Sequence, residues 1–204
     1  MKKRVVKDPK IRKTEILKAA GELFENQGYN NTTVEAIIQQ VGIAKGTFYY
    51  YFKSKEDILD ALVHEMVSQL SENYKKIAAD HEMNAMDKMR QMLRGQSYLQ
   101  EKESELMESL HRPENRELHE RINVEIILKI SPIFAGVIEQ GKKESVFNVE
   151  NPLQTIQFLL AGSQFLLESG LFNWNEEEQM KQVLSMQVII ERSLGAAPGS
   201  FSFI

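Results

Sequence analysis

The apolar residues of this chain recur at the spacing of amphipathic helices. In the first predicted helix, Ile16, Ala20, Leu23 and Phe24 stand at i, i+4, i+7 and i+8, which places them on one helix face. We find no segment of useful length with the strict apolar–polar alternation of a strand. The pattern therefore predicts an all-α chain of about nine helices.

Start and stop signals divide this pattern into elements. Asp8 followed by Pro9 predicts the start of the first helix, because Asp caps free backbone N–H groups and proline is tolerated in the first turn. Gly28 predicts the end of that helix, with Tyr29 folding back onto Phe24. The later helices are expected between Thr33 and Gly42 and over residues 45–52, 54–79, 84–101, 103–111, 115–141, 153–171 and 176–194.

Two short helices near the N-terminus are separated by a glycine. Thr32, with Glu35 three residues later, matches a capping box at the start of the first of them. Gly42 permits the positive φ of a tight turn, and residues 45–52 form the second helix. Two short helices across a glycine turn, preceded by a supporting helix, predict a helix-turn-helix whose second helix enters the DNA major groove.

The exposed chemistry of this second helix suits contact with DNA. Lys45, Gly46 and Thr47 stand at its N-terminus, where base edges are met, and Gly46 lets the backbone approach closely. The three tyrosines over 49–51 cannot all face inward, because neighbours on a helix point about 100° apart. Their hydroxyls can reach phosphates or bases, Lys55 offers a charge, and Thr33 can give its hydroxyl and backbone N–H to a phosphate.

Taken together, these residues resemble the DNA-binding domain of the TetR family of repressors. The resemblance covers about residues 10–60 and rests on residues 28–34, 42–52 and 54–59. It implies base contacts near Lys45, Gly46 and Thr47, and a helical ligand-binding and dimerisation domain in the rest of the chain. The phosphate contacts that it implies are Thr33, Tyr49, Tyr50 and Lys55. Ile38 and Val41 are larger than the small residues usual at these positions in the family.

Charge is distributed unevenly along the chain. Residues 1–55 hold eleven Lys and Arg against five Asp and Glu, a formal charge of +6, whereas the other 149 residues carry −10. A basic N-terminal part on an acidic body is typical of a module that binds a polyanion. With no cysteine and no recognisable secretory signal, we expect a cytoplasmic protein.

We predict three parts: a helix-turn-helix domain over 1–53, a helical ligand-binding and dimerisation domain over 54–195, and a tail over 196–204. The tail is expected to be loose, with the alternative that Phe201, Phe203 and Ile204 pack against the body. The last two helices carry apolar residues on more than one face, which predicts that they pair with their copies in a two-fold four-helix bundle. The alternative is that they form only the core of a monomer. The expected interface residues are Ile156, Leu160, Ser163, Leu167, Val183, Met186 and Ile190.

Methionine and aromatic residues in the body suit an apolar effector pocket, although they are also typical of an ordinary core. The candidates are Met66, Tyr74, Met89, Tyr98, Met107, His111, Phe134, Phe165 and Trp174. We expect no cofactor, no metal and no enzyme activity, because no ligand spacing or catalytic set stands out. The sequence thus predicts a homodimeric repressor that leaves a palindromic double-stranded DNA operator when a small molecule binds. The alternative is a helical DNA-binding or interaction protein without ligand control.

Overall fold

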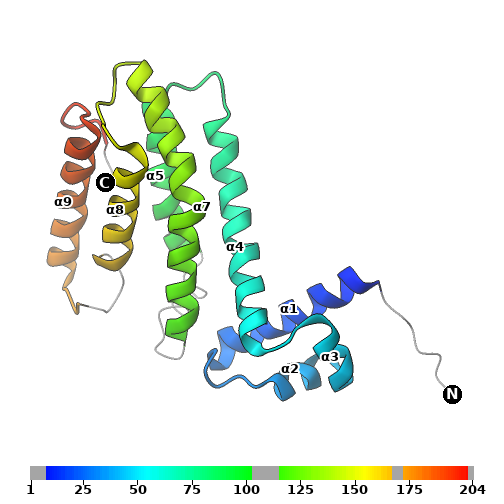
Figure 1. Ribbon diagram of the computed structural model, residues 1–204. Coiled ribbons are helices and arrows are strands. Elements are labelled where there is room, and N and C mark those ends of the chain that lie inside the picture. The colour runs from blue at the N-terminus through cyan, green and yellow to red at the C-terminus, as the bar shows by residue number, and fades with distance from the viewer. Residues whose placement is uncertain (1–7, 103–114, 167–171, 202–204) are drawn as a thin grey trace. The chain divides into compact units, whose positions relative to one another are not determined.

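The computed structural model describes residues 8–102, 115–166 and 172–201, with the backbone alone over 95–102. Within these ranges the chain forms eight α-helices and no strand, which confirms the predicted fold class (Figure 1). The predicted helix over 103–111 lies outside the described residues. The helices are α1 (Pro9–Gln27), α2 (Val34–Val41), α3 (Lys45–Tyr51), α4 (Lys55–Ala78), α5 (Ala85–Lys102), α7 (Arg116–Lys143), α8 (Pro152–Leu166) and α9 (Glu176–Leu194).

The signals at both ends of α1 act as the sequence predicts. The Asp8 carboxylate accepts a hydrogen bond from the backbone N–H of Lys10 at 2.8 Å, and proline occupies the first turn. Gly28 ends the helix with a φ of 86°. The chain then turns back, so that the Tyr29 ring meets the Phe24 ring edge-on, with 5.1 Å between ring centroids.

The start of α2 differs from the predicted capping box by one residue. Thr33 is the N-cap, and its hydroxyl accepts a hydrogen bond from the backbone N–H of Ala36 at 3.1 Å. Thr32 is buried instead, where its hydroxyl donates to the carbonyl of Gly28 at 2.8 Å. Because Thr32 closes the end of α1, Glu35 has no capping partner there and its carboxylate is left for Lys45.

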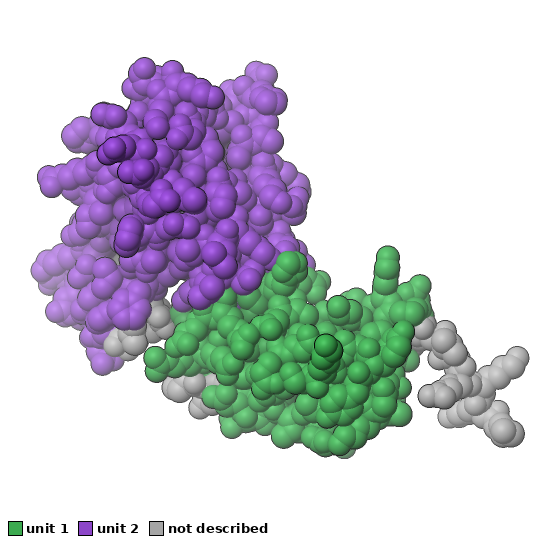
Figure 2. All heavy atoms as spheres, viewed as in Figure 1, with its two compact units in different colours: residues 1–66, 105–121 green, residues 67–104, 122–204 purple. Residues whose placement is uncertain are grey.

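The chain divides into two compact units, coloured separately in Figure 2. Unit 1 comprises residues 1–66 and 105–121, and unit 2 comprises residues 67–104 and 122–204. The division falls inside α4, later than the sequence suggested, because Ile58 and Leu59 of α4 are fully buried and belong to unit 1. Over the described ranges, we find no helix with the length and apolar character needed to cross a membrane.

The described part of the tail, residues 196–201, is held in unit 2 at Phe201, as in the alternative to a loose tail. The Phe201 side chain is buried and its ring stacks on that of Phe147, with 6.4 Å between centroids. The backbone N–H of Phe201 donates to the Glu191 carboxylate at 3.0 Å, and the Arg90 guanidinium donates to the carbonyl of Ser200 at 2.8 Å. One buried aromatic ring with two polar anchors is enough to order a short segment rich in small residues.

Candidate DNA-binding site

The helix-turn-helix of unit 1 forms as predicted, around a left-handed glycine. Gly42 has φ 69° and ψ 40°, and its backbone N–H donates to the carbonyl of Ile38 at 3.0 Å, which closes the end of α2. Ile37 of α2 and Phe48 of α3 are fully buried and anchor the two helices in the core of the unit. Ile38 and Val41, the two larger-than-usual residues, are only half-buried.

The surface of α3 carries the side chains that the sequence assigns to DNA. Lys45 is exposed and Thr47 is half-buried. Tyr49 and Tyr50 are 46% and 76% exposed, which confirms that the tyrosine run does not all face inward. Phe48, by contrast, is fully buried, so the helix has one face in the core and one face open to a partner.

Gly46 lies on the exposed part of the first turn of α3. A Cβ atom built at this position meets no heavy atom of the protein within 4 Å. The fold therefore does not require glycine here, since neither a positive φ nor a close internal contact demands it. What glycine does supply is bare backbone at the point where a recognition helix approaches base edges.

An exposed ion pair, which DNA could replace as the partner of the lysine, links α2 to α3. The Lys45 ammonium lies 3.3 Å from the Glu35 carboxylate and 5.9 Å from the centroid of the Tyr49 ring. A hydrogen bond from its own backbone N–H, followed by the Lys45 ammonium, holds the pKa of Glu35 below its usual value. Both side chains are exposed, and exposed ion pairs are weak, so the Lys45 ammonium is available to a phosphate or a base.

Lys55 is turned to an internal partner. Its ammonium donates to the carbonyl of Tyr29 at 2.7 Å and lies 4.1 Å from the centroid of the Tyr29 ring. Burial, followed by the nearby carboxylates of Glu56 and Glu117, raises the pKa of Tyr29 to about 12, so its ring remains a neutral phenol. Lys55 thus supports the loop that leads to Thr33, which is itself exposed at the start of α2.

Asn115 is a supporting residue that sequence reasoning missed. Its side chain is fully buried, and its carbonyl oxygen accepts from the backbone N–H of Tyr29 at 2.6 Å. Its amide nitrogen donates to the carbonyl of Phe24 at 3.3 Å, which satisfies the C-terminal end of α1. No local pattern marks it, because its partners lie 86 and 91 residues away along the chain.

The predicted pocket residues are brought together only in part. In unit 2, Tyr74 and Phe134 are buried with their ring centroids 5.3 Å apart, and Met89 is also fully buried. Phe165 is exposed and contacts Phe172, which stacks on Trp174. Met66 belongs to unit 1. The side chains of Tyr98, Met107 and His111 lie outside the described residues.

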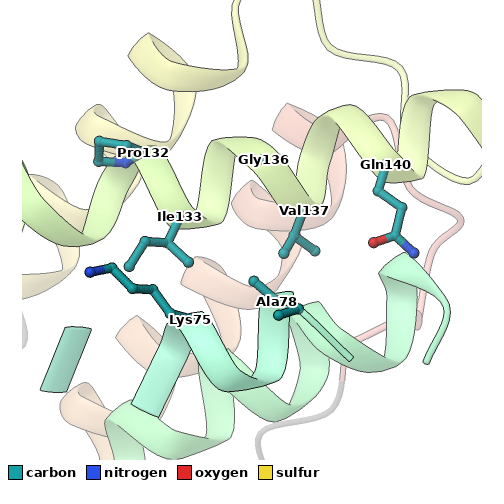
Figure 3. Close-up of a pocket in the computed structure, with 8 residues that line it drawn as sticks. Lys75, Ala78, Pro132, Ile133, Gly136, Val137 and Gln140 are labelled. Carbon is teal, nitrogen blue, oxygen red and sulfur yellow. The ribbon is translucent and has the colours of Figure 1, made fainter. Parts of the chain in front are cut away.

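A groove of about 480 Å³ opens between α4 and α7 in unit 2. Figure 3 shows Ile133, Val137 and Gln140 of α7 pointing toward the segment of α4 that carries Lys75 and Ala78. None of the predicted pocket residues lines this groove. The lining residues are Lys75, Ala78, Ala79, Pro132, Ile133, Gly136, Val137 and Gln140.

Helices α8 and α9 lie side by side and expose an apolar surface, although not with the residues predicted for it (Figure 1). Ile156, Leu160 and Ile190 are buried, because these helices turn those positions into unit 2. Ser163, Val183 and Met186 are half-buried, and Leu167 lies outside the described residues. The exposed apolar residues, which we call the α8–α9 face, are Phe158, Phe165, Leu166, Met180, Leu184, Val188 and Ile189.

Two family models match this chain. The model described as "Bacterial regulatory proteins, tetR family" matches residues 16–62, which contain α2, α3 and parts of α1 and α4. The model described as "Tetracyclin repressor-like, C-terminal domain" matches residues 99–189. The two matches follow the arrangement seen in the structure, a helix-turn-helix followed by a helical body.

Relatives among characterised proteins point the same way. The chain is 34% identical over 134 residues to the fatty acid metabolism regulator protein of Bacillus subtilis, and the aligned region covers 62% of this chain and 66% of the relative. It is 37% identical over 68 residues to the HTH-type transcriptional repressor KstR2 of Rhodococcus jostii, and that aligned region covers 33% of each chain. The chain thus spans just under two thirds of the length of the first relative and one third of the second.

Solved structures share the fold over almost their whole length. The transcriptional regulator FadR from Bacillus subtilis in complex with stearoyl-CoA aligns with a TM-score of 0.63 at 24% identity, covering 90% of this chain and 98% of that one. The fatty acid degradation regulator FadR from Bacillus halodurans aligns with a TM-score of 0.64 at 20% identity, covering 90% and 96%. Motif, fold and family models agree, and the chain belongs to the TetR family of bacterial regulatory proteins.

Proposed function

We propose that this protein is a homodimeric transcriptional repressor that binds a palindromic operator through α3 and releases it when an acyl-CoA binds unit 2. The observation that carries the DNA-binding part is the exposed face of α3. There a bare glycine backbone at Gly46 lies beside the Lys45 ammonium and the Tyr49 and Tyr50 hydroxyls. The proposed operator is chromosomal, so the proposed site of action is the cytoplasm.

The contacts divide by chemistry. The first turn of α3, Lys45 to Thr47, reads base edges, because the N-terminal residues of a recognition helix lie deepest in the major groove. The Tyr49 and Tyr50 hydroxyls and the backbone at Thr33 hold phosphates, which fix the register of the protein on DNA. Lys55 supports the DNA-binding loop and does not contact DNA itself, since its ammonium already binds the carbonyl of Tyr29.

Salt dependence tests the role of Lys55. A lysine that neutralises a phosphate contributes about 0.9 to the slope of log affinity against log salt, and its removal lowers that slope. Lys55→Met should weaken binding with the slope unchanged, because it perturbs the loop before Thr33. Lys45→Met should weaken binding and relax the preference for the operator sequence, because its side chain is assigned to base edges. A fall of about 0.9 in the slope of Lys55→Met would return Lys55 to the phosphate contacts.

The dimer is supported by the α8–α9 face. Its side chains include Phe158, which is 81% exposed, and an apolar surface of this kind on two adjacent helices needs a partner. In the proposed dimer a second copy related by a two-fold axis covers this face with the same surface, and a palindromic operator then requires the two recognition helices to lie about 34–36 Å apart. Val188→Glu should give a monomer in sedimentation experiments. A wild-type monomer at micromolar concentration would refute the dimer.

The effector assignment is supported by two relatives. One is described as a fatty acid metabolism regulator protein, and a solved structure that shares the fold holds stearoyl-CoA. In this chain α4 contributes residues to both units, so a ligand that moves α4 in unit 2 also moves its first turns in unit 1. A coupling of about 1–3 kcal/mol between the two sites is typical of such regulators.

Fluorescence anisotropy with labelled DNA from upstream of the protein's own gene tests the proposal. We expect wild-type protein to bind it and stearoyl-CoA to release it, whereas the double variant Lys45→Ala, Tyr49→Ala stays folded and does not bind. Equal binding of unrelated DNA, with no response to stearoyl-CoA, would favour a helical DNA-binding protein without ligand control. Normal binding by the double variant would show that the DNA-contact residues are misassigned.

A further inference from the structure

The hydroxyl of Tyr74 is buried in unit 2 without a hydrogen-bond partner. Tyr74 lies on α4 and is 2% exposed, and its Oη atom has no partner among the described residues. Native proteins leave few buried polar atoms unpaired, because each one loses its hydrogen bonds to water and gains nothing in return. The Tyr29 hydroxyl of unit 1 is also unpaired, but Tyr74 lies in the unit that is proposed to bind the effector, where a bound molecule can supply the missing partner.

Two other buried donors of the same unit are paired, and Glu125 Oε2, which also lacks a hydrogen bond, lies 3.0 Å from the Lys129 ammonium. The Lys88 ammonium donates to the carbonyl of Ala78 at 2.8 Å and to the side-chain oxygen of Gln140 at 2.9 Å. The Ser131 hydroxyl donates to the carbonyl of the residue one turn earlier on α7. These donors are satisfied within the protein, and the Tyr74 hydroxyl differs from them.

The surroundings of Tyr74 define the chemistry of the missing partner. Its ring meets that of Phe134 at 64°, with 5.3 Å between centroids. Burial raises the pKa of the Tyr74 phenol above its usual value near 10, and no charged side chain contributes to that shift. The hydroxyl is therefore a neutral donor in apolar surroundings, and an uncharged acceptor such as a carbonyl oxygen suits it.

The groove between α4 and α7 adjoins this ring pair along both helices. On α4 the groove begins at Lys75, next to Tyr74, and on α7 it includes Ile133, next to Phe134. Figure 3 shows that Val137 and Ile133 project into it from α7. The groove and the ring pair are thus carried by the same stretches of α4 and α7.

We propose that Tyr74 is the polar contact of the effector site, where its hydroxyl donates a hydrogen bond to the acyl carbonyl oxygen of the ligand. This inference rests on the acyl-CoA effector of the proposed function. The acyl chain packs among the apolar side chains around Phe134. The charged coenzyme portion stays at the surface, because burying its phosphates without paired cations is costly.

Calorimetric titration of the full chain with two ligands tests this contact. Stearoyl-CoA has a thioester carbonyl, and the thioether S-octadecyl-CoA has a chain of the same length without the carbonyl. Wild-type protein should bind the thioester roughly tenfold more tightly, which is the effect of one buried hydrogen bond. In Tyr74→Phe this preference should disappear, because phenylalanine keeps the ring and removes only the hydroxyl.

The controls distinguish this contact from a general loss of structure. Tyr51→Phe removes a half-buried hydroxyl from unit 1 and should keep the preference for the thioester. Without ligand, Tyr74→Phe should melt at or above the temperature of the wild type, since it loses an unpaired buried group. If the ratio of the affinity for stearoyl-CoA to that for S-octadecyl-CoA is the same in wild type and in Tyr74→Phe, the role of Tyr74 is refuted and the acyl-CoA effector stands. If wild type binds neither ligand, the effector assignment fails, and this inference fails with it.

Discussion

Replacing Gly46 by alanine should stabilise the fold and weaken operator binding. Gly46 is the second residue of α3, and a Cβ there meets no protein atom within 4 Å. Alanine in place of glycine inside a helix stabilises the folded protein by about 0.5–1 kcal/mol. At a position in the first turn we expect a gain near the lower end of this range. In a protein of this size 0.5 kcal/mol corresponds to roughly 1–2 °C in melting temperature.

The effect on DNA binding has the opposite sign. At the proposed interface the added methyl group lies between the backbone of α3 and the base edges that it approaches. Forcing an extra methyl into a packed contact costs about 1–3 kcal/mol. The affinity for the operator should therefore fall about 5- to 150-fold while the melting temperature rises. A change that only weakened the fold would lower both.

Gly21→Ala is the matched control for Gly46→Ala. Gly21 lies inside α1 in unit 1, and its Cβ would stand 3.8 Å from Leu62, an ordinary van der Waals distance. This variant should raise the melting temperature by at least as much and leave operator affinity unchanged. Calorimetry and anisotropy on all three proteins give both quantities. Operator affinity of Gly46→Ala equal to that of the wild type would refute the placement of the first turn of α3 at the bases.

Three further predictions concern the supports of the two units. Asn115→Ala removes two buried hydrogen bonds and leaves a backbone N–H unpaired, so it should cost about 2–4 kcal/mol in urea unfolding; a loss below about 1 kcal/mol would contradict this role. Gly141→Ala should cost about 1–3 kcal/mol, because its methyl would collide with the buried ring of Phe147; unchanged stability would show that the ring moves freely. The hydrogen bond from the Phe201 N–H lowers the pKa of Glu191, so its carboxylate stabilises the fold above the usual value of 4.5 and loses this effect as pH falls through the lowered pKa. The difference in melting temperature between wild type and Glu191→Gln should therefore shrink from pH 7 to pH 3, and a constant difference would exclude this linkage.

The sequence predicted best the features whose partners lie close together along the chain. Asp8 and Lys10, or Gly42 and Ile38, are joined by hydrogen bonds within one helical turn, so residue types and spacing suffice. The exposed tyrosines also follow from local helix geometry. The capping box at Thr32 failed even at short range, because the side chain was needed to close α1 instead.

Features that depend on distant contacts could not be predicted. Asn115 reads as an ordinary polar residue until the fold brings it to Tyr29, and the sequence does not reveal that Phe201 stacks on Phe147. Three residues predicted for a dimer interface, Ile156, Leu160 and Ile190, are instead buried in unit 2 for a related reason. Both faces of α8 and α9 are apolar, and periodicity alone cannot tell which face is turned into the core of the same chain.

Helix α4 connects the two proposed activities, and its bonds show how. Near its start the Lys55 ammonium binds the carbonyl of Tyr29, in the loop that leads to the recognition helices. At its end the carbonyl of Ala78 is held by the buried Lys88 ammonium. Its 24 residues belong to both compact units, so the proposed effector contact at Tyr74 and the support of the DNA-binding loop at Lys55 stand on the same helix. We therefore propose that a ligand bound at Tyr74 acts on the DNA-binding loop through this helix.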